Sequence, residues 1–155
     1  MKAGSVDSFD RKIIAILQRD NLTPQREISQ RVNLSPAAVH RRIRRLHDEG
    51  VIVADVAVID PAAVGRPLTI IAEIAVESER LEDLARVEEA LMKAPEVQQC
   101  YYVTGEVDFV LVLTATDMAE YEKFTKRVFF ANENIKRFRT LVAMKVAKLG
   151  LSVPS

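Results

Sequence analysis

The chain has 155 residues, an apolar fraction of 48% and no net charge, with 22 Lys/Arg against 22 Asp/Glu. This length allows one domain or two small ones, and the composition is that of an ordinary globular protein. Cys100 is the single cysteine, which excludes a disulfide framework, and no apolar run reaches the ~18 residues of a membrane span. We therefore expect a cytoplasmic protein.

The charge is unevenly distributed along the chain. Residues 1–50 contain 10 Lys/Arg and 6 Asp/Glu, a net charge of +4. Residues 51–155 contain 12 Lys/Arg and 16 Asp/Glu, a net charge of −4. A basic first part joined to an acidic second part indicates two regions with separate roles.

Two short helices are predicted first. Asp7 is a side-chain cap for the first helix, and Asp10 follows three residues later near the positive end of the helix. Its apolar stripe consists of Phe9, Ile13, Ile14 and Leu17. Thr23 as a cap, followed by Pro24, predicts the start of a second helix, which ends at Asn33 because asparagine tolerates positive φ.

A third helix is predicted from Ser35, its cap, to Gly50, which readily takes the left-handed conformation that ends a helix. Val39, Ile43 and Leu46 recur on one apolar face. The opposite face is small near its N-terminus and cationic after it, which suits entry into the DNA major groove. The candidate DNA-binding residues are Ser35, Ala37, Ala38, His40, Arg41, Arg42, Arg44 and Arg45.

Two interpretations of this helical region remain open. An ordinary three-helix bundle would have similar apolar stripes, with the arginines as a solvated basic face. The short turn, the caps and the arginines together favour a helix-turn-helix over residues 26–45. Arg42 lies near the border of the apolar face, so its stem packs while its head pairs locally or contacts phosphate.

The boundary between the two regions is predicted near two turn signals, Asp60-Pro61 and Gly65-Arg66-Pro67. Residues 51–59 are rich in β-branched residues and predict a strand that leads out of the helical region. These signals divide the chain into a DNA-binding domain over 1–60, a linker over 61–67 and a second domain over 68–155.

The second domain alternates between strand and helix patterns. Strands are predicted over 68–77, 97–104, 107–114 and 135–147, and a helix over 81–94, whose inward-facing residues are Leu81, Leu84, Val87 and Leu91. A second helix is predicted from Asp117, which caps a stripe beginning at Met118. The order β-α-β-β-α-β predicts an α+β, ferredoxin-like domain with an antiparallel sheet and both helices on one face. The uncovered sheet face predicts self-association.

Six stretches carry a resemblance to a known family: V-D-S-F-D-R-K-I-I at 6–14, L-S-P-A-A-V-H-R-R-I-R-R-L at 34–46, E-G-V-I at 49–52, V-T-G-E-V-D-F-V-L at 103–111, D-M-A-E-Y at 117–121 and R-T-L-V-A-M at 139–144. Their order and spacing resemble the Lrp/AsnC family, the feast/famine transcription regulators, over essentially the whole chain.

The resemblance implies homodimers that assemble into octamers and bind an amino acid between subunits near the glycine–aspartate hairpin. The implied effector-binding residues are Tyr102, Thr104, Gly105, Glu106, Asp108, Met118, Thr140, Leu141 and Val142. Turn N–H groups at 104–106 suit the carboxylate of an amino acid, and the Asp108 carboxylate suits its ammonium group. Structural roles compete with this reading, since Gly105 also fits a plain turn and Asp108 an intersubunit ion pair.

One departure from the family pattern is the segment Ala131-Asn132-Glu133-Asn134, where many relatives have a proline-glycine turn. Lys136, Arg137 and Arg139 follow it. The effector pocket or the dimer–dimer contact therefore differs from that of the usual amino-acid sensor, or the chain binds no effector.

Three other function classes compete with a sensing regulator. An enzyme is disfavoured because His40 and His47 both lie on the arginine-rich helix, and no nucleophile–base pair, phosphate loop or metal-ligand spacing is present. An architectural nucleoid protein without an effector stays open, as does a sensor whose helices contact only protein. We predict a sequence-specific DNA-binding transcriptional regulator with no cofactor, no metal and an amino acid or related small molecule as effector.

Overall fold

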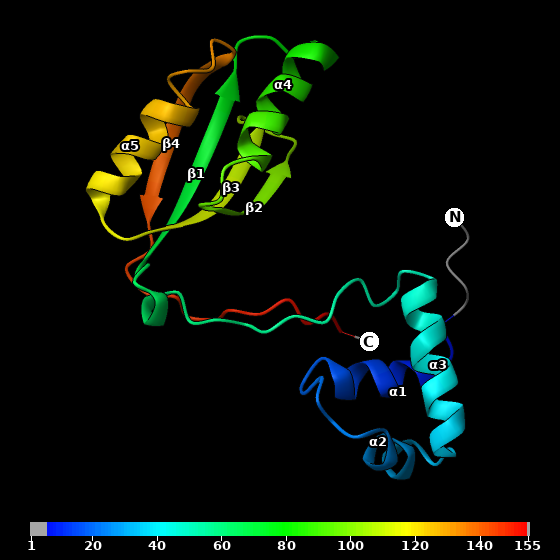
Figure 1. Cartoon of the computed structure of the whole chain (residues 1–155). Helices are drawn as coiled ribbons and strands as arrows, with labels where there is room; N and C mark the ends of the chain where they lie inside the picture. Colours follow the sequence, from blue (N-terminus) through cyan, green and yellow to red (C-terminus); the bar gives the residue numbers. More distant parts are fainter. Residues whose placement is uncertain (1–5, 155) are drawn as a thin grey trace. The chain divides into compact units, whose positions relative to one another are not determined.

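The computed structural model describes residues 6–154, which form two compact units (Figure 1). One unit contains the described chain up to Val58 together with the residues from Leu149 onward, and the other spans Ile59–Lys148. The second predicted domain, 68–155, differs from this structural unit at both ends, because the unit begins at Ile59, includes the predicted linker and ends at Lys148.

Three helices form the first unit: α1 (Ser8–Leu17), α2 (Gln25–Val32) and α3 (Pro36–Asp48). Their core consists of the fully or almost fully buried side chains of Ile13, Ile28, Val32 and Val39. The apolar stripes predicted from helical periodicity thus face one another, and the helix-turn-helix arrangement is confirmed.

Most of the predicted helix ends are confirmed by their hydrogen bonds. Asp7 accepts the N–H groups of Phe9 and Asp10, and Asp10 accepts that of Asp7, which completes a capping box. Asn33 ends α2 with a φ of 57°. The cap predicted at Thr23 is wrong, because its hydroxyl donates to the carbonyl of Asp20 (2.7 Å) and the helix begins after Pro24 without a side-chain cap.

The strand predicted over 51–59 is also wrong. This segment pairs with no strand of the described chain, and Val53 and Val58 are 88% and 82% exposed. A strand needs a partner strand for its backbone N–H and C=O groups, and residues 51–59 take part in none of the strand pairings of the sheet. A short 3₁₀ turn, η1 (Ala62–Val64), follows and ends at Gly65, whose φ is 79°.

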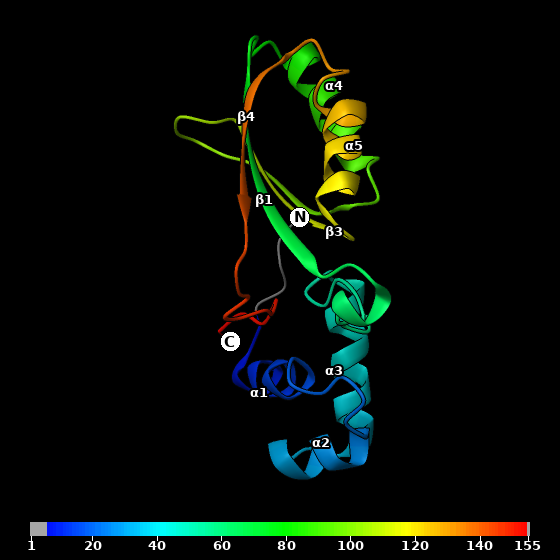
Figure 2. The same cartoon turned by 90° about the vertical axis from the view of Figure 1, so that its left-hand side faces the viewer.

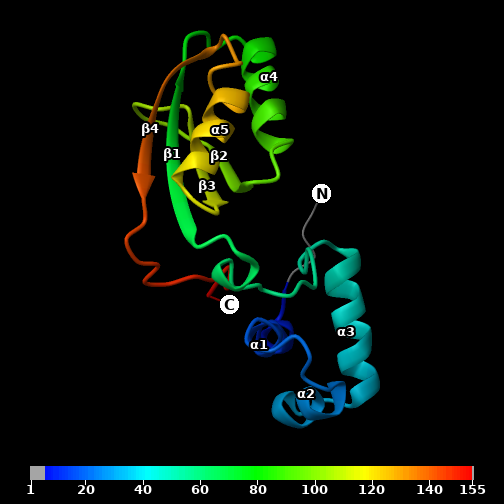
Figure 3. The ribbon, with the colours of Figure 1, turned by 60° about the vertical axis from the view of Figure 1, so that its left-hand side comes forward.

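The second unit is a four-stranded antiparallel sheet with two helices. Its elements are β1 (Leu68–Val76), α4 (Leu81–Met92), β2 (Val97–Tyr102), β3 (Phe109–Ala115), α5 (Met118–Val128) and β4 (Ile135–Val142). The strand order is β2-β3-β1-β4. Figures 2 and 3 show both helices on one face of the sheet, which confirms the predicted β-α-β-β-α-β fold.

The core of this unit lies between the sheet and the helices. Ile70, Ala72 and Ile74 alternate along β1 and are fully buried against helical residues such as Leu91 and Phe124. The alternate residues point to the other side, which we call the open face. By strand register it carries Thr69, Ile71, Glu73, Gln99, Tyr101, Val110, Val112, Arg139 and Leu141.

Two further predictions are wrong, one at the end of β4 and one at the start of α4. The last strand stops at Val142 rather than 147, because Ala143 makes the final bond to β1, from its N–H to the Thr69 carbonyl (2.9 Å). Leu81, predicted to face inward, is 84% exposed at the first position of α4. Among residues 6–154 we find no helix with the length and apolar character needed to cross a membrane.

Candidate nucleic-acid interface and effector site

The solvent side of α3 carries two arginines that form no ion pair with any other described residue. Val39 and Leu46 are fully buried, which turns the opposite side of the helix outward. Arg41 and Arg44 lie on that outer side and are exposed. Within residues 6–154 neither side chain forms a hydrogen bond or an ion pair. Both guanidinium groups are therefore available to a negatively charged partner.

The first turn of α3 is built from small residues. The Ser35 hydroxyl accepts the N–H of Ala38 (3.1 Å) and so caps the helix. Ala37 is exposed and Ala38 is half-buried. With side chains this small, another backbone or a base edge can approach the N-terminus of the helix closely.

The other two candidate arginines are held by α1. Arg42 Nη1 lies 2.7 Å from Asp7 Oδ2 and 2.8 Å from Asp10 Oδ1. Arg45 Nη2 lies 2.5 Å from Asp10 Oδ2. The Asp10 side chain is fully buried, whereas those of Arg42 and Arg45 are 25% and 41% exposed. We call these four residues the Asp10 clasp; it fixes the orientation of α3 on α1.

Two members of the clasp, Asp7 and Arg42, have shifted pKa values. The N–H of Asp10, followed by the Arg42 guanidinium, lowers the pKa of Asp7 from 3.8 to about 2. Hydrogen bonds from Asp7 and Asp10 raise the pKa of Arg42 in turn. Because the pKa of Asp7 is lowered by folding, its stabilising contribution is present above pH 3.8 and is lost as the pH falls towards 2.

Sequence reasoning missed the burial of Asp10, a residue of the candidate site. It was recognised only as part of the capping box. A second signal was present, because Asp10, Ile13, Ile14 and Leu17 are spaced i, i+3, i+4 and i+7. An acidic residue inside an apolar stripe is buried only when it is paired, so the arginines of a neighbouring helix were its natural partners.

Gln25, the first residue of α2, contacts the outer side of α3 and was also missed. Its Nε2 lies 3.1 Å from Nδ1 of His40, and both residues are exposed. The other histidine, His47, lies instead 3.4 Å from the Asp55 carboxylate. Fifteen residues separate Gln25 from His40, so only the turn between the two helices brings them together.

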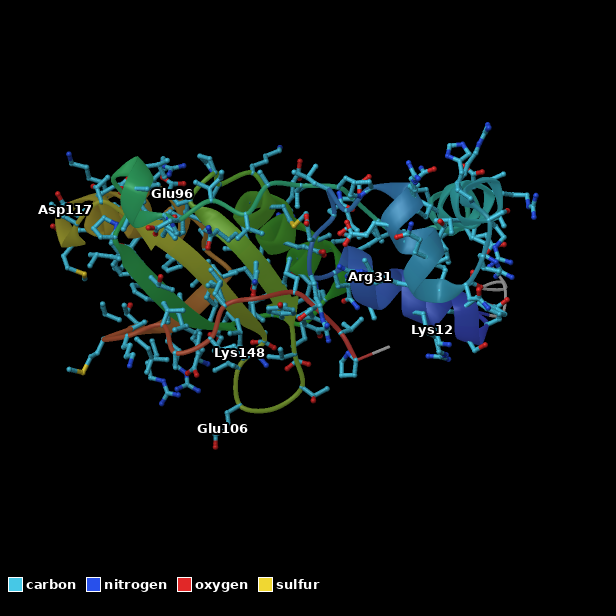
Figure 4. All side chains as sticks on the ribbon, turned by 90° about the horizontal axis from the view of Figure 1, so that it is seen from below. Lys12, Arg31, Glu96, Glu106, Asp117 and Lys148 are labelled. Carbon is cyan, nitrogen blue, oxygen red and sulfur yellow. The ribbon has the colours of Figure 1, made fainter. Side chains whose placement is uncertain are left out.

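Part of the predicted effector site lies at the β2–β3 loop. Thr104, Gly105 and Glu106 are exposed there, with Gly105 at a φ of 131°. Glu106 points away from the protein at the tip of this loop (Figure 4). Tyr102 is 63% exposed, and its ring lies 5.3 Å from that of Phe109. Because these residues are exposed, the β2–β3 loop is accessible to a ligand or a neighbouring subunit.

Asp108 has a structural contact in addition to its predicted role. Its Oδ2 accepts the N–H of Val76 (2.7 Å), and its own N–H donates to the carbonyl of Ile74 (2.8 Å). The register of β1 against β4 shifts between Ala75 and Val76, so Asp108 satisfies a backbone group next to this irregularity. Within residues 6–154 its Oδ1 forms no hydrogen bond.

Most of the remaining predicted effector residues lie on the edge strand β4, further along the sheet. Thr140, Leu141 and Val142 pair with Ala72, Ile71 and Ile70, whereas Asp108 lies near Ile74. Two to four residues of β1 separate these positions from Ile74, about 7–13 Å at ~3.3 Å per residue. Met118 is 49% exposed, and the Thr140 hydroxyl bonds that of Tyr121 (2.6 Å). One chain thus does not bring the predicted residues together.

A hollow of about 700 Å³ lies elsewhere, between α4, the end of α5 and residues 131–134. It includes the charged side chains of Asp83, Arg86 and Arg127 and none of the predicted effector residues. The Asn134 amide bonds both the carbonyl (3.0 Å) and the N–H (2.8 Å) of Ser78. This amide organises the turn in which many relatives have proline and glycine.

Comparison with known proteins matches both units. Residues 6–53 match the winged helix-turn-helix DNA-binding family, and residues 69–153 match the Lrp/AsnC ligand binding domain. The HTH-type transcriptional regulator y4tD of Sinorhizobium fredii is 42% identical over 152 residues, which cover 98% of this chain and 90% of that protein.

Solved structures agree with this match. An AsnC family transcriptional regulator from Agrobacterium tumefaciens has a TM-score of 0.90 at 34% identity, with 96% of each chain covered. The transcriptional regulator NMB0573 from Neisseria meningitidis, solved as a complex with L-Met, has a TM-score of 0.90 at 27% identity, with 97% of each chain covered.

Proposed function

This chain belongs to the Lrp/AsnC family of transcriptional regulators, and from that premise we propose that it binds specific DNA sites as a homo-oligomer and responds to a small molecule. It is a regulator with a helix-turn-helix and a ligand-binding domain, and not an enzyme. We further propose that the ligand is an amino acid or a related molecule.

The observation that carries the DNA-binding proposal is the difference in contacts among the four arginines of α3. Arg42 and Arg45 are held by Asp10, whereas Arg41 and Arg44 are exposed and unpaired within the described chain. A recognition helix places its N-terminal half in the major groove, so Arg41 is in position for base edges. Arg44, one turn closer to the C-terminus, is in position for phosphate.

Arg41→Ala should therefore relax sequence preference, and Arg44→Ala should weaken binding to all sequences alike. The first change removes a base contact of about 1–3 kcal/mol, and the second removes a phosphate contact and lowers the salt slope by about 1. Fluorescence anisotropy against a selected operator and a scrambled duplex, at several salt concentrations, measures both effects.

Arg19→Ala is the matched control, since Arg19 is an exposed arginine beyond the end of α1 and outside the helix-turn-helix. It should leave affinity and salt slope close to those of the wild type. Unchanged operator selectivity in the Arg41 variant would contradict the proposed orientation of α3.

The open face supports self-association. Ile71 lies between Val112 and Leu141 in a row of apolar side chains across three strands, and both helices of this unit, α4 and α5, lie on the opposite face of the sheet. A second copy has the same apolar row and can cover it. We propose that the dimer forms across the open face and that dimers assemble further into octamers.

Dimerisation also bears on the effector site. The two groups of predicted effector residues lie apart on one sheet, on the two sides of β1, so a compact pocket requires one group from each of two neighbouring subunits. An amino acid suits such a pocket because loop N–H groups near Gly105 bind its carboxylate and Asp108 binds its ammonium group. The L-Met complex of the Neisseria relative supports the choice of an amino acid.

The effector proposal is tested by Asp108→Asn, after a thermal-shift screen over the free amino acids has identified a ligand. The amide oxygen of asparagine still accepts the Val76 N–H, so the fold is kept while the charge is removed. Calorimetry should show amino-acid binding weakened about ten- to hundredfold, as expected for loss of a charge-assisted bond of ~1.5–3 kcal/mol.

Asp60→Asn is the matched control, because the Asp60 carboxylate also accepts a backbone N–H, that of Ala62 (3.0 Å), away from the β2–β3 loop. This variant should bind the amino acid as the wild type does. Equal affinity in the Asp108 variant places the ammonium group elsewhere, and a screen without any ligand favours an architectural DNA-binding role instead.

A further inference from the structure

The contact between Gln25 and His40 determines whether the other ring nitrogen of His40, Nε2, donates or accepts a hydrogen bond. The Gln25 amide nitrogen is a donor only, and it lies 3.1 Å from Nδ1 of His40. Nδ1 must therefore accept, so in the neutral ring the proton is on Nε2. Nε2 lies on the far side of the ring from Gln25 and is then a hydrogen-bond donor.

His40 lies where a recognition helix contacts bases. It is the fifth residue of α3, exposed and adjacent to Arg41. The N-terminal residues of such a helix contact base edges in the major groove. The acceptors available there are guanine N7 and O6, adenine N7 and thymine O4, whereas cytosine N4 and adenine N6 only donate.

We propose that Gln25 is a positioning residue that orients the His40 ring and keeps its proton on Nε2, so that His40 recognises a hydrogen-bond acceptor on one base of each half-site. This inference rests on the proposed DNA binding and adds a specificity element to it. Gln25 holds the ring from the neighbouring helix, which reduces the freedom that the side chain loses on binding.

The first test is the proton position in the wild-type protein. Long-range ¹H–¹⁵N correlation spectra at pH 8.5, where an ordinary imidazole is neutral, distinguish the two tautomers. We expect His40 to have its proton on Nε2 and an unprotonated Nδ1. A proton on Nδ1 would overturn the inference without any variant.

The second test is base discrimination. Gln25→Ala and His40→Ala should each lower discrimination about five- to tenfold at the same single base-pair position of the half-site, measured by anisotropy on a set of singly substituted operators. Because the two residues act as a unit, the double variant should be no worse than His40→Ala alone. His40→Gln, which keeps an N–H donor, should retain part of the discrimination.

Gln30→Ala is the matched control, since Gln30 is an exposed glutamine of the same helix, with no partner among the described residues. It should leave discrimination unchanged. A uniform loss over all operators in the Gln25 and His40 variants would indicate phosphate contact and overturn the base-reading role. Unchanged discrimination would also overturn it, while the Arg41 variant still tests DNA binding separately.

Discussion

Replacing Arg42 and Arg45 together by alanine should lower the free energy of unfolding of the helical unit by about 3–5 kcal/mol. Both side chains bind the carboxylate of Asp10, which is fully buried. Their removal leaves the buried Asp10 carboxylate with the N–H of Asp7 as a hydrogen-bond donor but without a cationic partner, which is the costly way to break a buried ion pair. Hydrogen exchange of α1 and α3 peptides in the full-length protein measures the loss within this unit.

Two comparisons separate this effect from a simple loss of positive charge. Arg41→Ala with Arg44→Ala removes the same charge from the same helix, but these side chains are unpaired, so stability should change by less than about 0.5 kcal/mol. Adding Asp10→Leu to the Arg42/Arg45 double variant should recover much of the loss, because the stranded carboxylate is gone. Failure of this rescue would contradict a buried-charge origin.

The parts of the fold that were predicted correctly depend on chemistry close in sequence. Asp7, Ser35 and Asp117 cap helices because each carboxylate or hydroxyl reaches an N–H two or three residues later. Asn33 ends α2 because asparagine tolerates the left-handed conformation. The alternation along β1 needs only the sequence, since a strand with one buried face has a period of two.

The failures depend on partners that are distant in sequence. Residues 51–59 have strong β-propensity, yet a strand forms only where another strand lies beside it. The last strand ends where β1 begins, at the bond between Ala143 and Thr69, although its apolar pattern continues. Local pattern predicts which segments can become strands and does not predict where their pairing stops.

The candidate sites show the same contrast between features that depend on nearby residues and features that depend on residues distant in sequence. Helical periodicity correctly placed Arg41 and Arg44 on the outer side of α3. It also places Asp10 within an apolar stripe, but only the structure identifies Arg42 and Arg45, 32 and 35 residues away, as its partners. The effector residues were grouped by family resemblance. Strand register shows that Asp108 and Leu141 lie on the two sides of β1, three residues apart along it, which no spacing in the sequence indicates.

Ile71→Asp should convert the protein to a monomer at micromolar concentration if the open face forms the dimer. Ile71 is half-buried in one chain, between Val112 and Leu141, so a carboxylate there is solvated in the monomer. At a two-fold interface each copy would bury this charge against apolar side chains, at a cost of at least about 3 kcal/mol. Dimer affinity should then fall more than a hundredfold.

Met92→Asp is the matched control, because Met92 is an exposed methionine on α4, on the helical side of the sheet. Sedimentation should find this variant associated as the wild type is and the Ile71 variant monomeric with unchanged helix content. DNA binding provides an independent readout. A dimer binds two half-sites at once, and the linked second contact has a high effective concentration. The monomeric variant should therefore lose its preference for the full palindrome and keep its affinity for one half-site, whereas damage to α3 would lower both.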